Sequence, residues 1–275
     1  MSVYSNKTIL SLLNMINEML RKNIEISRIT KAASLLLLSG LSPYDINIKI
    51  INNCLDSQRP DGGFIGNTDT IWNVNLLGFY PEFFTQREKA LLWLKSFNGE
   101  EPGYGRSKRD MHRIPVTGLA LYLLPEIADE KTLMWLEDTW LKEKNSLTYK
   151  AAYTLLAFNS CSYIPYTKNL VQDTCSWLAS QQQVSGGFAP LLDHPVGENV
   201  YCTAVAMLAL ICQNDTKLTS VIYKAYDYLC SSQLKSGVWP YHEIEDGAGW
   251  GLLALTKGEI YLEENYENLV SVYSP

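Results

Sequence analysis

An all-α fold, built as a single-domain barrel of six helix pairs, is predicted by three observations. Apolar residues recur at spacings of three and four along most of the chain, which is the period of an α-helix. Three segments, 54–64, 177–188 and 228–239, repeat one pattern, in which a helix end with Gln leads into a glycine–aromatic turn. A short apolar helix follows each segment, so the repeating unit is a pair of helices.

Six register positions, one at the start of each second helix, divide the chain into these pairs. They are Thr30, Thr70, Thr117, Lys150, Thr203 and Ala248. The predicted pairs are 5–22 with 27–39, 46–57 with 69–79, 85–97 with 114–124, 129–143 with 147–158, 167–182 with 200–212, and 217–232 with 247–257.

The two helices of each pair differ in composition. The first carries the charged residues, whereas the second is nearly free of charge and rich in Ala, Gly, Thr and Leu. A helix that is apolar on all sides must be covered on all sides. We therefore expect an inner ring of six second helices inside an outer ring of six first helices. This α6/α6 barrel would span residues 1–258, with 259–275 as a C-terminal strap on its outer surface.

Composition narrows the range of partners. The chain has 275 residues, 47% of them hydrophobic, and a formal net charge of −6, which disfavours nucleic acid as a partner. No apolar run approaches the ~18 residues of a transmembrane helix, and the N-terminal stretch reads as an amphipathic helix rather than a signal peptide. We expect a cytoplasmic protein. Its six cysteines contain no Cys-x-x-Cys pair and are expected to be buried free thiols.

The glutamine turns carry a family resemblance. The sixth repeat resembles the glutamine-tryptophan repeat of squalene and oxidosqualene cyclases position for position, reading Lys224-Ala225-x-x-Tyr228-Leu229-x-x-x-Gln233-x-x-x-Gly237-x-Trp239. The fifth repeat matches well, and the second and third match in part. The phrase Gln…Asp-Gly-Gly-Phe is also similar to the β-subunits of protein prenyltransferases, which share the fold. We assign four residues of the motif to barrel stability, namely Gln58, Gln182, Gln233 and Trp239.

The resemblance implies a central cavity at the N-terminal ends of the inner helices. Trp72 and Trp250 occupy the same register position in two repeats, two residues after the helix start, and Tyr153 lies at the equivalent face of another. Aromatic faces stabilise cations, which suits carbocation chemistry. The alternative is that these rings only fill space.

Acidic residues at the same level are candidates for catalysis. Proton-initiated (class II) cyclases use Asp-x-Asp-Asp-Thr at an inner-helix start, and the middle Asp is the general acid. The resemblance places Asp246 in that position, with Glu243 and Glu245 tuning it, although Ile244 and Gly247 break the strict motif. Asp69 keeps the last Asp of the motif in the second repeat. N-capping is the alternative role for Asp69 and Asp246.

A metal site is not predicted. The zinc ligands of protein prenyltransferases would require Asp and Cys around one inner-helix start and His at the next. Asp69 is present, but Ile71 and Val116 occupy the other places. No cofactor is therefore expected, except that Mg²⁺ is conceivable if the substrate is a diphosphate.

The loop 103–113 is basic in an otherwise acidic chain. Prenyltransferases use Arg and Lys from loops at this level to hold a diphosphate, and Arg suits bidentate contacts with anions. We expect Arg109 and Arg113 to bind an anionic head group with the help of His112, unless the loop is simply solvated. His194, His242 and Tyr201 would line the mouth of the cavity on the same side.

The predicted function is that of a terpene-cyclase-like enzyme, which cyclises a prenyl or polyene substrate by acid initiation. One alternative is a non-catalytic barrel that binds a lipid or a protein partner, like a prenyltransferase β-subunit without zinc, with peripheral membrane contact possible in either case. A second is carbohydrate hydrolysis or elimination, which would need Asp69 to face Asp246 or Glu198 across the cavity.

Overall fold

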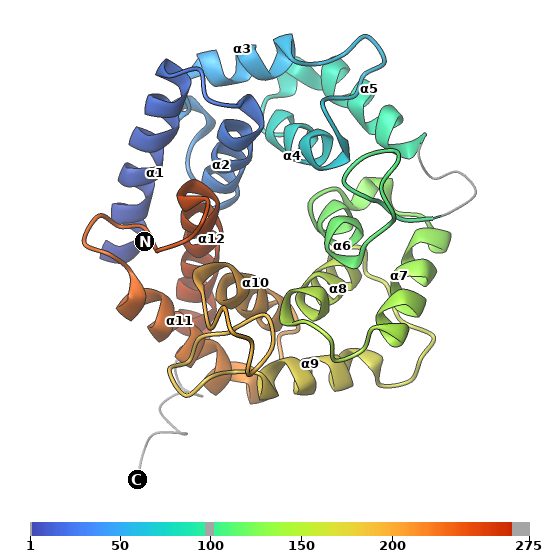
Figure 1. The fold of residues 1–275 in the computed structure, drawn as a ribbon, viewed down its shortest axis with the longest axis vertical. Coiled ribbons are helices and arrows are strands. Elements are labelled where there is room, and N and C mark those ends of the chain that lie inside the picture. The colour runs from blue at the N-terminus through green and yellow to red at the C-terminus, as the bar shows by residue number, and fades with distance from the viewer. Residues whose placement is uncertain (1, 97–101, 266–275) are drawn as a thin grey trace.

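The computed structural model describes residues 2–96 and 102–265. Within these residues the chain forms twelve α-helices in two concentric rings (Figure 1), and its one β-bridge is the isolated pair Gln182–Phe188. The predicted all-α barrel of six helix pairs is confirmed.

The inner and outer helices alternate along the chain. The inner ring consists of α2 (Ile26–Leu38), α4 (Asn67–Leu77), α6 (Ile114–Leu123), α8 (Thr148–Ser160), α10 (Val200–Ile211) and α12 (Ile244–Glu264). The outer ring consists of α1 (Val3–Arg21), α3 (Ile48–Asp56), α5 (Phe84–Lys95), α7 (Glu130–Lys142), α9 (Leu170–Ser180) and α11 (Thr219–Ser232). Four 3-10 turns precede outer helices, at Pro43–Asp45, Pro81–Phe83, Pro125–Ile127 and Thr216–Leu218.

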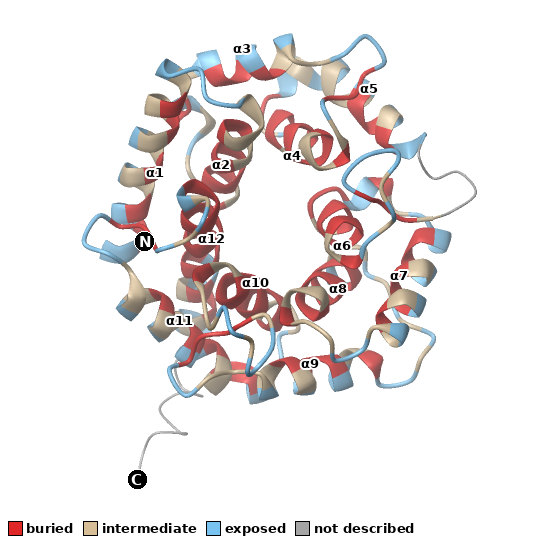
Figure 2. Ribbon diagram, viewed as in Figure 1, coloured by how far each residue is buried: buried red, intermediate tan, exposed pale blue. Residues whose placement is uncertain are grey.

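Burial follows the predicted difference between the two rings. In α10, every residue from Val200 to Leu210 except Tyr201 is buried, whereas α1 buries one stripe that includes Leu12 and Ile16 (Figure 2). The inner helices are covered by one another and by the outer ring, which is why they are apolar on most sides.

The C-terminal boundary differs from the expectation. Residues 259–264 continue α12 instead of forming a strap, while the rest of the expected strap, 266–275, lies outside the described residues. The extension is held by polar contacts with two outer helices. The Tyr261 hydroxyl lies 3.0 Å from Thr219 Oγ1, and the Glu259 carboxylate accepts hydrogen bonds from Ser2 and Ser5 at 2.5–2.9 Å.

The glutamine side chains join each turn to the next outer helix. Gln182 Nε2 donates to the carbonyl of Gly186 in its own turn at 2.9 Å and to that of Val221 at 2.8 Å in α11. Gln58 makes the same two kinds of contact at 2.9 and 2.8 Å, the second with α5. Gln233 Nε2 donates to Thr8 Oγ1 of α1 at 2.9 Å, which closes the ring between the last repeat and the first.

The register threonines link the same turns to the inner helices. Thr70, Thr117 and Thr203 are fully buried, and each hydroxyl accepts the backbone N–H of an aromatic residue in the preceding turn. The donors are Phe64 at 3.1 Å, Tyr104 at 2.8 Å and Phe188 at 2.9 Å. Equivalent residues therefore make equivalent contacts in three repeats.

Replacing Gly186 by Ala should destabilise the barrel. Gly186 has φ +92°, and a Cβ there would lie 2.2 Å from the Lys224 carbonyl oxygen of the next outer helix. Backbone strain and overpacking together should lower the free energy of unfolding by about 3 kcal/mol. Gly197 is the matched control, because it also has positive φ (+69°) but has no atom within 4 Å of its added Cβ. Gly197→Ala should cost only about 1 kcal/mol. Equal urea midpoints for the two variants would contradict the packing argument.

Candidate active site

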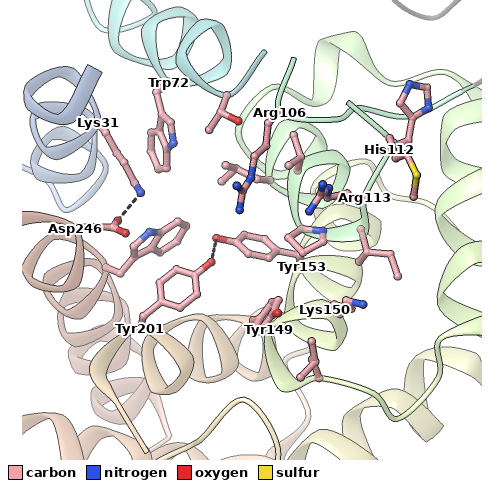
Figure 3. A pocket seen from close by; sticks show the side chains of 18 of the residues that line it. Lys31, Trp72, Arg106, His112, Arg113, Tyr149, Lys150, Tyr153, Tyr201 and Asp246 are labelled. Atoms are coloured by element: carbon pink, nitrogen blue, oxygen red, sulfur yellow. Dashed lines mark hydrogen bonds and ion pairs between the residues drawn. The ribbon is translucent and has the colours of Figure 1, made fainter. Parts of the chain in front are cut away.

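A cavity of about 720 Å³ opens at the N-terminal ends of the inner helices. Its volume falls within the range of small-molecule sites. Side chains from all six inner helices line it, together with the loop that precedes α6 (Figure 3). The site is therefore central in the barrel, at the level that the family resemblance implied.

Aromatic rings form one part of this cavity around Trp250. The ring centroids of Trp72, Tyr153 and Tyr201 lie 5.8, 6.1 and 6.1 Å from that of Trp250, and all three pairs meet edge to face. Such pairs are favourable because the positive edge of one ring meets the negative face of another. Faces not used in this way can stabilise a cationic group in the cavity.

Two phenols in this cluster share a hydrogen bond. The hydroxyl oxygens of Tyr153 and Tyr201 are 2.9 Å apart (Figure 3), and Tyr201 stacks on Tyr241 at a centroid distance of 5.9 Å. Burial is the main cause that raises the pKa of Tyr153, Tyr201 and Tyr241, and the nearby charge of Asp246 adds to it. All three phenols are therefore neutral near pH 7.

The carboxyl group of Asp246 forms an ion pair inside the cavity. Asp246 is in the first turn of α12 and is 6% exposed. Lys31 Nζ, from α2, lies 2.7 Å from Asp246 Oδ1 and 5.7 Å from the centre of the Trp72 ring. The ammonium group and the partial positive charge of the helix N-terminus both attract the carboxylate.

Glu243 and Glu245, expected to tune Asp246, do not line the cavity. Arg28 binds the Glu245 carboxylate at 2.5 Å, and Glu245 is 4% exposed. Glu243 occupies the N-cap position of α12, where its backbone carbonyl accepts the N–H groups of Asp246 and Gly247 at 3.1 and 3.0 Å. The helical twist turns Glu245 away from the cavity because it is adjacent to Asp246, whereas Glu243 is the N-cap residue, whose extended backbone lies outside the regular helix.

Basic groups form the wall opposite Asp246. Figure 3 shows Arg106 and Arg113 reaching into the cavity from the loop before α6, and Lys150 from α8 beside them. Arg113 pairs with Asp110 at 2.8 Å, and Lys150 pairs with Glu143. In the described part of the chain no carboxylate forms an ion pair with the Arg106 side chain. Four cationic and two carboxylate side chains line the cavity, so an anion is favoured there.

His112 and Arg109 come from the same loop but have different places. His112 lines the cavity, and its Nδ1 donates to the carbonyl oxygen of Pro102 at 2.8 Å. Arg109 instead faces a separate hollow of about 350 Å³ beside Trp93. The loop closes on itself through a hydrogen bond of 3.0 Å from Arg113 N to Tyr104 O. This closure leaves Arg106 and Arg113 near the stem, facing inward, and Arg109 at the tip.

Three further sequence candidates lie outside the cavity. His194 Nδ1 accepts the N–H of Val196 at 3.2 Å, and the exposed His242 packs on Tyr241 at 4.2 Å. Asp69 accepts the backbone N–H of Gly66, the N-cap residue of α4, which is a capping interaction. Burial and then the charge of Glu25 raise the pKa of Asp69, and the hydrogen bond lowers it.

The structure thus brings together seven of the predicted residues, namely Asp246, Trp72, Trp250, Tyr153, Tyr201, His112 and Arg113. Lys31, Arg106, Tyr149 and Lys150 are among the lining residues that the sequence analysis did not select as site residues. Two of them could have been identified from their positions in the repeat. Tyr149 and Lys150 occupy the last position before, and the first position of, the fourth inner-helix start.

The described residues lack the side-chain groups or helices of two other classes of site. No three His, Cys, Asp or Glu side chains there are grouped closely enough to hold a metal ion. No helix among them has the length and apolar character to cross a bilayer.

No protein-family model and no curated protein matches the sequence, but solved structures resemble the fold. The type II terpene cyclase MstE from Scytonema, without ligand, has a TM-score of 0.72 at 14% sequence identity, over 94% of this chain and 99% of that chain. A variant of the same cyclase in complex with geranylgeranyl dihydroxybenzoate, its substrate, has a TM-score of 0.70 at 13% identity over the same shares. A protein from Actinoplanes has a TM-score of 0.66 at 12% identity, over 85% of this chain and 90% of that chain.

The chain has a terpene-cyclase-like fold. At these identities the likeness concerns the arrangement of the helices and the length of chain that forms it. In this terpene-cyclase-like barrel, the cavity described above is lined by side chains of the six inner helices and of loops that lead into them.

The hydrogen bond between Tyr153 and Tyr201 should be measurable as an energetic coupling. Phe at either position leaves the remaining hydroxyl without its partner among aromatic rings, which should cost about 1 kcal/mol of unfolding free energy. The double variant should cost less than the sum of the two, with a coupling of about 1 kcal/mol. Urea unfolding of the wild type, both single variants and the double variant gives the cycle. Strictly additive effects would show that the two hydroxyls do not interact.

Proposed function

We propose that the protein is a class II-type terpene cyclase that acts on a prenyl chain with an anionic head group. The observation that carries this proposal is one cavity that combines a carboxyl group, Asp246, with an aromatic cluster and an opposing basic wall. A proton donor, a surface that stabilises cations and an anchor for the head group are the three parts that acid-initiated cyclisation of such a substrate requires.

The reaction would begin at Asp246 in its protonated form. The O–H bond of the carboxyl group breaks as a C–H bond forms at the terminal alkene of the substrate, and a carbocation results. Ring closure moves the positive charge along the chain past Trp72, Trp250, Tyr153 and Tyr201, whose π-systems stabilise it. The last cation loses one proton to solvent, so the product is an isomer of the substrate.

The basic wall would hold the head group at the other side of the cavity. Arg106 takes the role first expected for Arg109, alongside Arg113, while Lys150 and His112 complete the wall. Arg side chains bind carboxylates and phosphates through paired hydrogen bonds. The substrate in the similar MstE complex carries a benzoate, which is a head group of this class.

A specific observation favours a second candidate, a barrel that binds the same ligand without converting it. A general acid must carry a proton, and the Lys31 ammonium at 2.7 Å favours the deprotonated form of Asp246. If Asp246 stays ionised with ligand bound, the aromatic cluster and the basic wall still form a binding site for a prenylated anion, in which Asp246 only fixes Lys31.

Turnover separates the two candidates. Incubated with geranylgeranyl dihydroxybenzoate, the purified protein should form a product of unchanged mass with fewer double bonds, detectable by liquid chromatography with mass spectrometry and proton NMR. Asp246→Asn should reduce turnover at least a thousandfold, which is toward the upper end of the rate acceleration that one positioned acid group supplies. Ligand binding should persist. Binding of the compound without any isomeric product would support the binding-only candidate. Full turnover by Asp246→Asn would refute the acid assignment.

Two arginines of one loop give a matched test of the head-group site. Arg106→Ala and Arg113→Ala should each weaken binding of a prenylated carboxylate by about ten- to a hundredfold, because each loses a charge-assisted hydrogen bond. Arg109→Ala removes the same charge from the same loop but outside the cavity, and should change affinity less than about twofold at physiological salt. Equal losses in all three variants would indicate that only the general charge of the loop matters.

A further inference from the structure

The ion pair between Lys31 and Asp246 conflicts with the reaction that the cavity is proposed to perform. Initiation needs a proton on Asp246, and the ammonium of Lys31 lies 2.7 Å from its carboxylate. Lys31 is not fixed by packing alone, because its side chain is about a quarter exposed, at 24%. The conflict is removed if the state of this pair depends on what occupies the cavity.

The charges around Asp246 are few. Lys31 of α2 is the cation that contacts it, and the adjacent Glu245 is already neutralised by Arg28. The charge of Asp246 raises the pKa of three phenols, those of Tyr153, Tyr201 and Tyr241, which are protonated near neutral pH. Glu243 lies next to Tyr241 and outside the cavity. Lys31 also acts on Asp69, whose pKa its charge lowers. Lys31 and any charge that enters the cavity are therefore the charges that act most directly on Asp246.

A bound anion would act on Asp246 in two ways, and both favour its protonated form. An anion on the basic wall and Asp246 would share one cavity of about 720 Å³ that is lined in part by aromatic rings, and charges that are partly buried in this way are screened much less than charges at the protein surface. The anion also attracts the Lys31 ammonium, which reaches the cavity on a flexible stem. A like charge and a weakened ion pair both favour the protonated carboxyl.

We propose that binding of the anionic head group places the proton on Asp246, and that Lys31 withholds that proton while the cavity is empty. This inference rests on the proposed function and adds to it that Lys31 is a positioning residue that makes the acid depend on substrate. One proton from solvent forms the O–H bond of Asp246 when the ligand binds. That proton becomes the new C–H hydrogen, and the product cation returns one proton to solvent, so none is consumed overall.

Proton uptake upon binding tests this directly, without turnover. Phytanic acid, a saturated isoprenoid carboxylic acid, has no alkene to protonate and serves as the probe. Calorimetric titrations of the intact protein in two buffers of different ionisation enthalpy give the number of protons taken up per ligand bound. We expect net uptake of at most one proton per ligand, falling toward zero at low pH, where Asp246 is protonated before binding. Phytanol, with the same chain and a neutral head group, should bind without uptake.

Variants assign the proton to the pair. Asp246→Asn should bind phytanic acid without proton uptake, which excludes His112 and the ligand itself as the acceptor. In Lys31→Met the carboxyl lacks its ammonium partner and holds its proton before the ligand arrives, so uptake should also fall and the pH of maximal uptake should rise. The double variant Arg28→Met/Glu245→Gln is the matched control, because it removes both charges of the neighbouring α2–α12 ion pair together and should leave uptake unchanged.

The outcomes separate this inference from the proposed function. Binding of phytanic acid by the wild type without proton uptake would overturn the inference and leave the proposed function standing. Uptake that persists in Asp246→Asn, or equal uptake with phytanol, would also overturn it, and neither the phytanol comparison nor the wild-type titration depends on a variant folding. Failure of both ligands to bind would refute the prenyl site itself, and the inference with it.

Discussion

The hydrogen bonds from the glutamine side chains to the following outer helix are the interaction on which the architecture depends. Each Gln amide joins a turn to a neighbour, and the last of these contacts, from Gln233 to Thr8, connects α11 to α1. Helices apolar on every side cannot stand at an open edge, since their outer faces would meet water. Closing the ring removes such an edge. The glutamine contacts join α3 to α5, α9 to α11 and α11 to α1, and so help to hold the amphipathic outer helices around the buried inner ring.

The closed ring in turn creates the site. The inner helices are parallel, so their six N-terminal ends, each with partial positive charge, gather at one end of the barrel. Residues within a few positions of each helix start must then face a common cavity. This geometry explains why Trp72 and Trp250, from repeats far apart in sequence, meet at 5.8 Å. The helix N-termini also favour anions in the cavity, independently of the side chains that line it.

The fold and the level of the site could be predicted from the sequence because both follow from a repeated local pattern. The register threonines mark equivalent contacts, and the two tryptophans occupy one register position. Lys31 and Arg106 were not selected because their roles depend on contacts that no local pattern encodes. Lys31 pairs with Asp246 only because the first and last inner helices become neighbours when the ring closes. Arg106 lies at the cavity and Arg109 outside it because hydrogen bonds within the loop, and from Asn67 of α4 to the Arg106 carbonyl, fix its backbone.

The ion pair at Asp246 has a chemical consequence that distinguishes this cavity from an ordinary aromatic pocket. A protonated carboxyl strong enough to attack an alkene would also be available to any apolar molecule that entered the cavity, whereas an ionised carboxylate cannot initiate the reaction at all. The basic wall and the Lys31–Asp246 pair therefore both respond to the charge of the molecule in the cavity. A neutral hydrocarbon brings no such charge, and a prenylated anion does. In such an arrangement, recognition of the head group at one wall and generation of the acid at the other are a single electrostatic event, so specificity would be exerted on the chemical step as well as on binding.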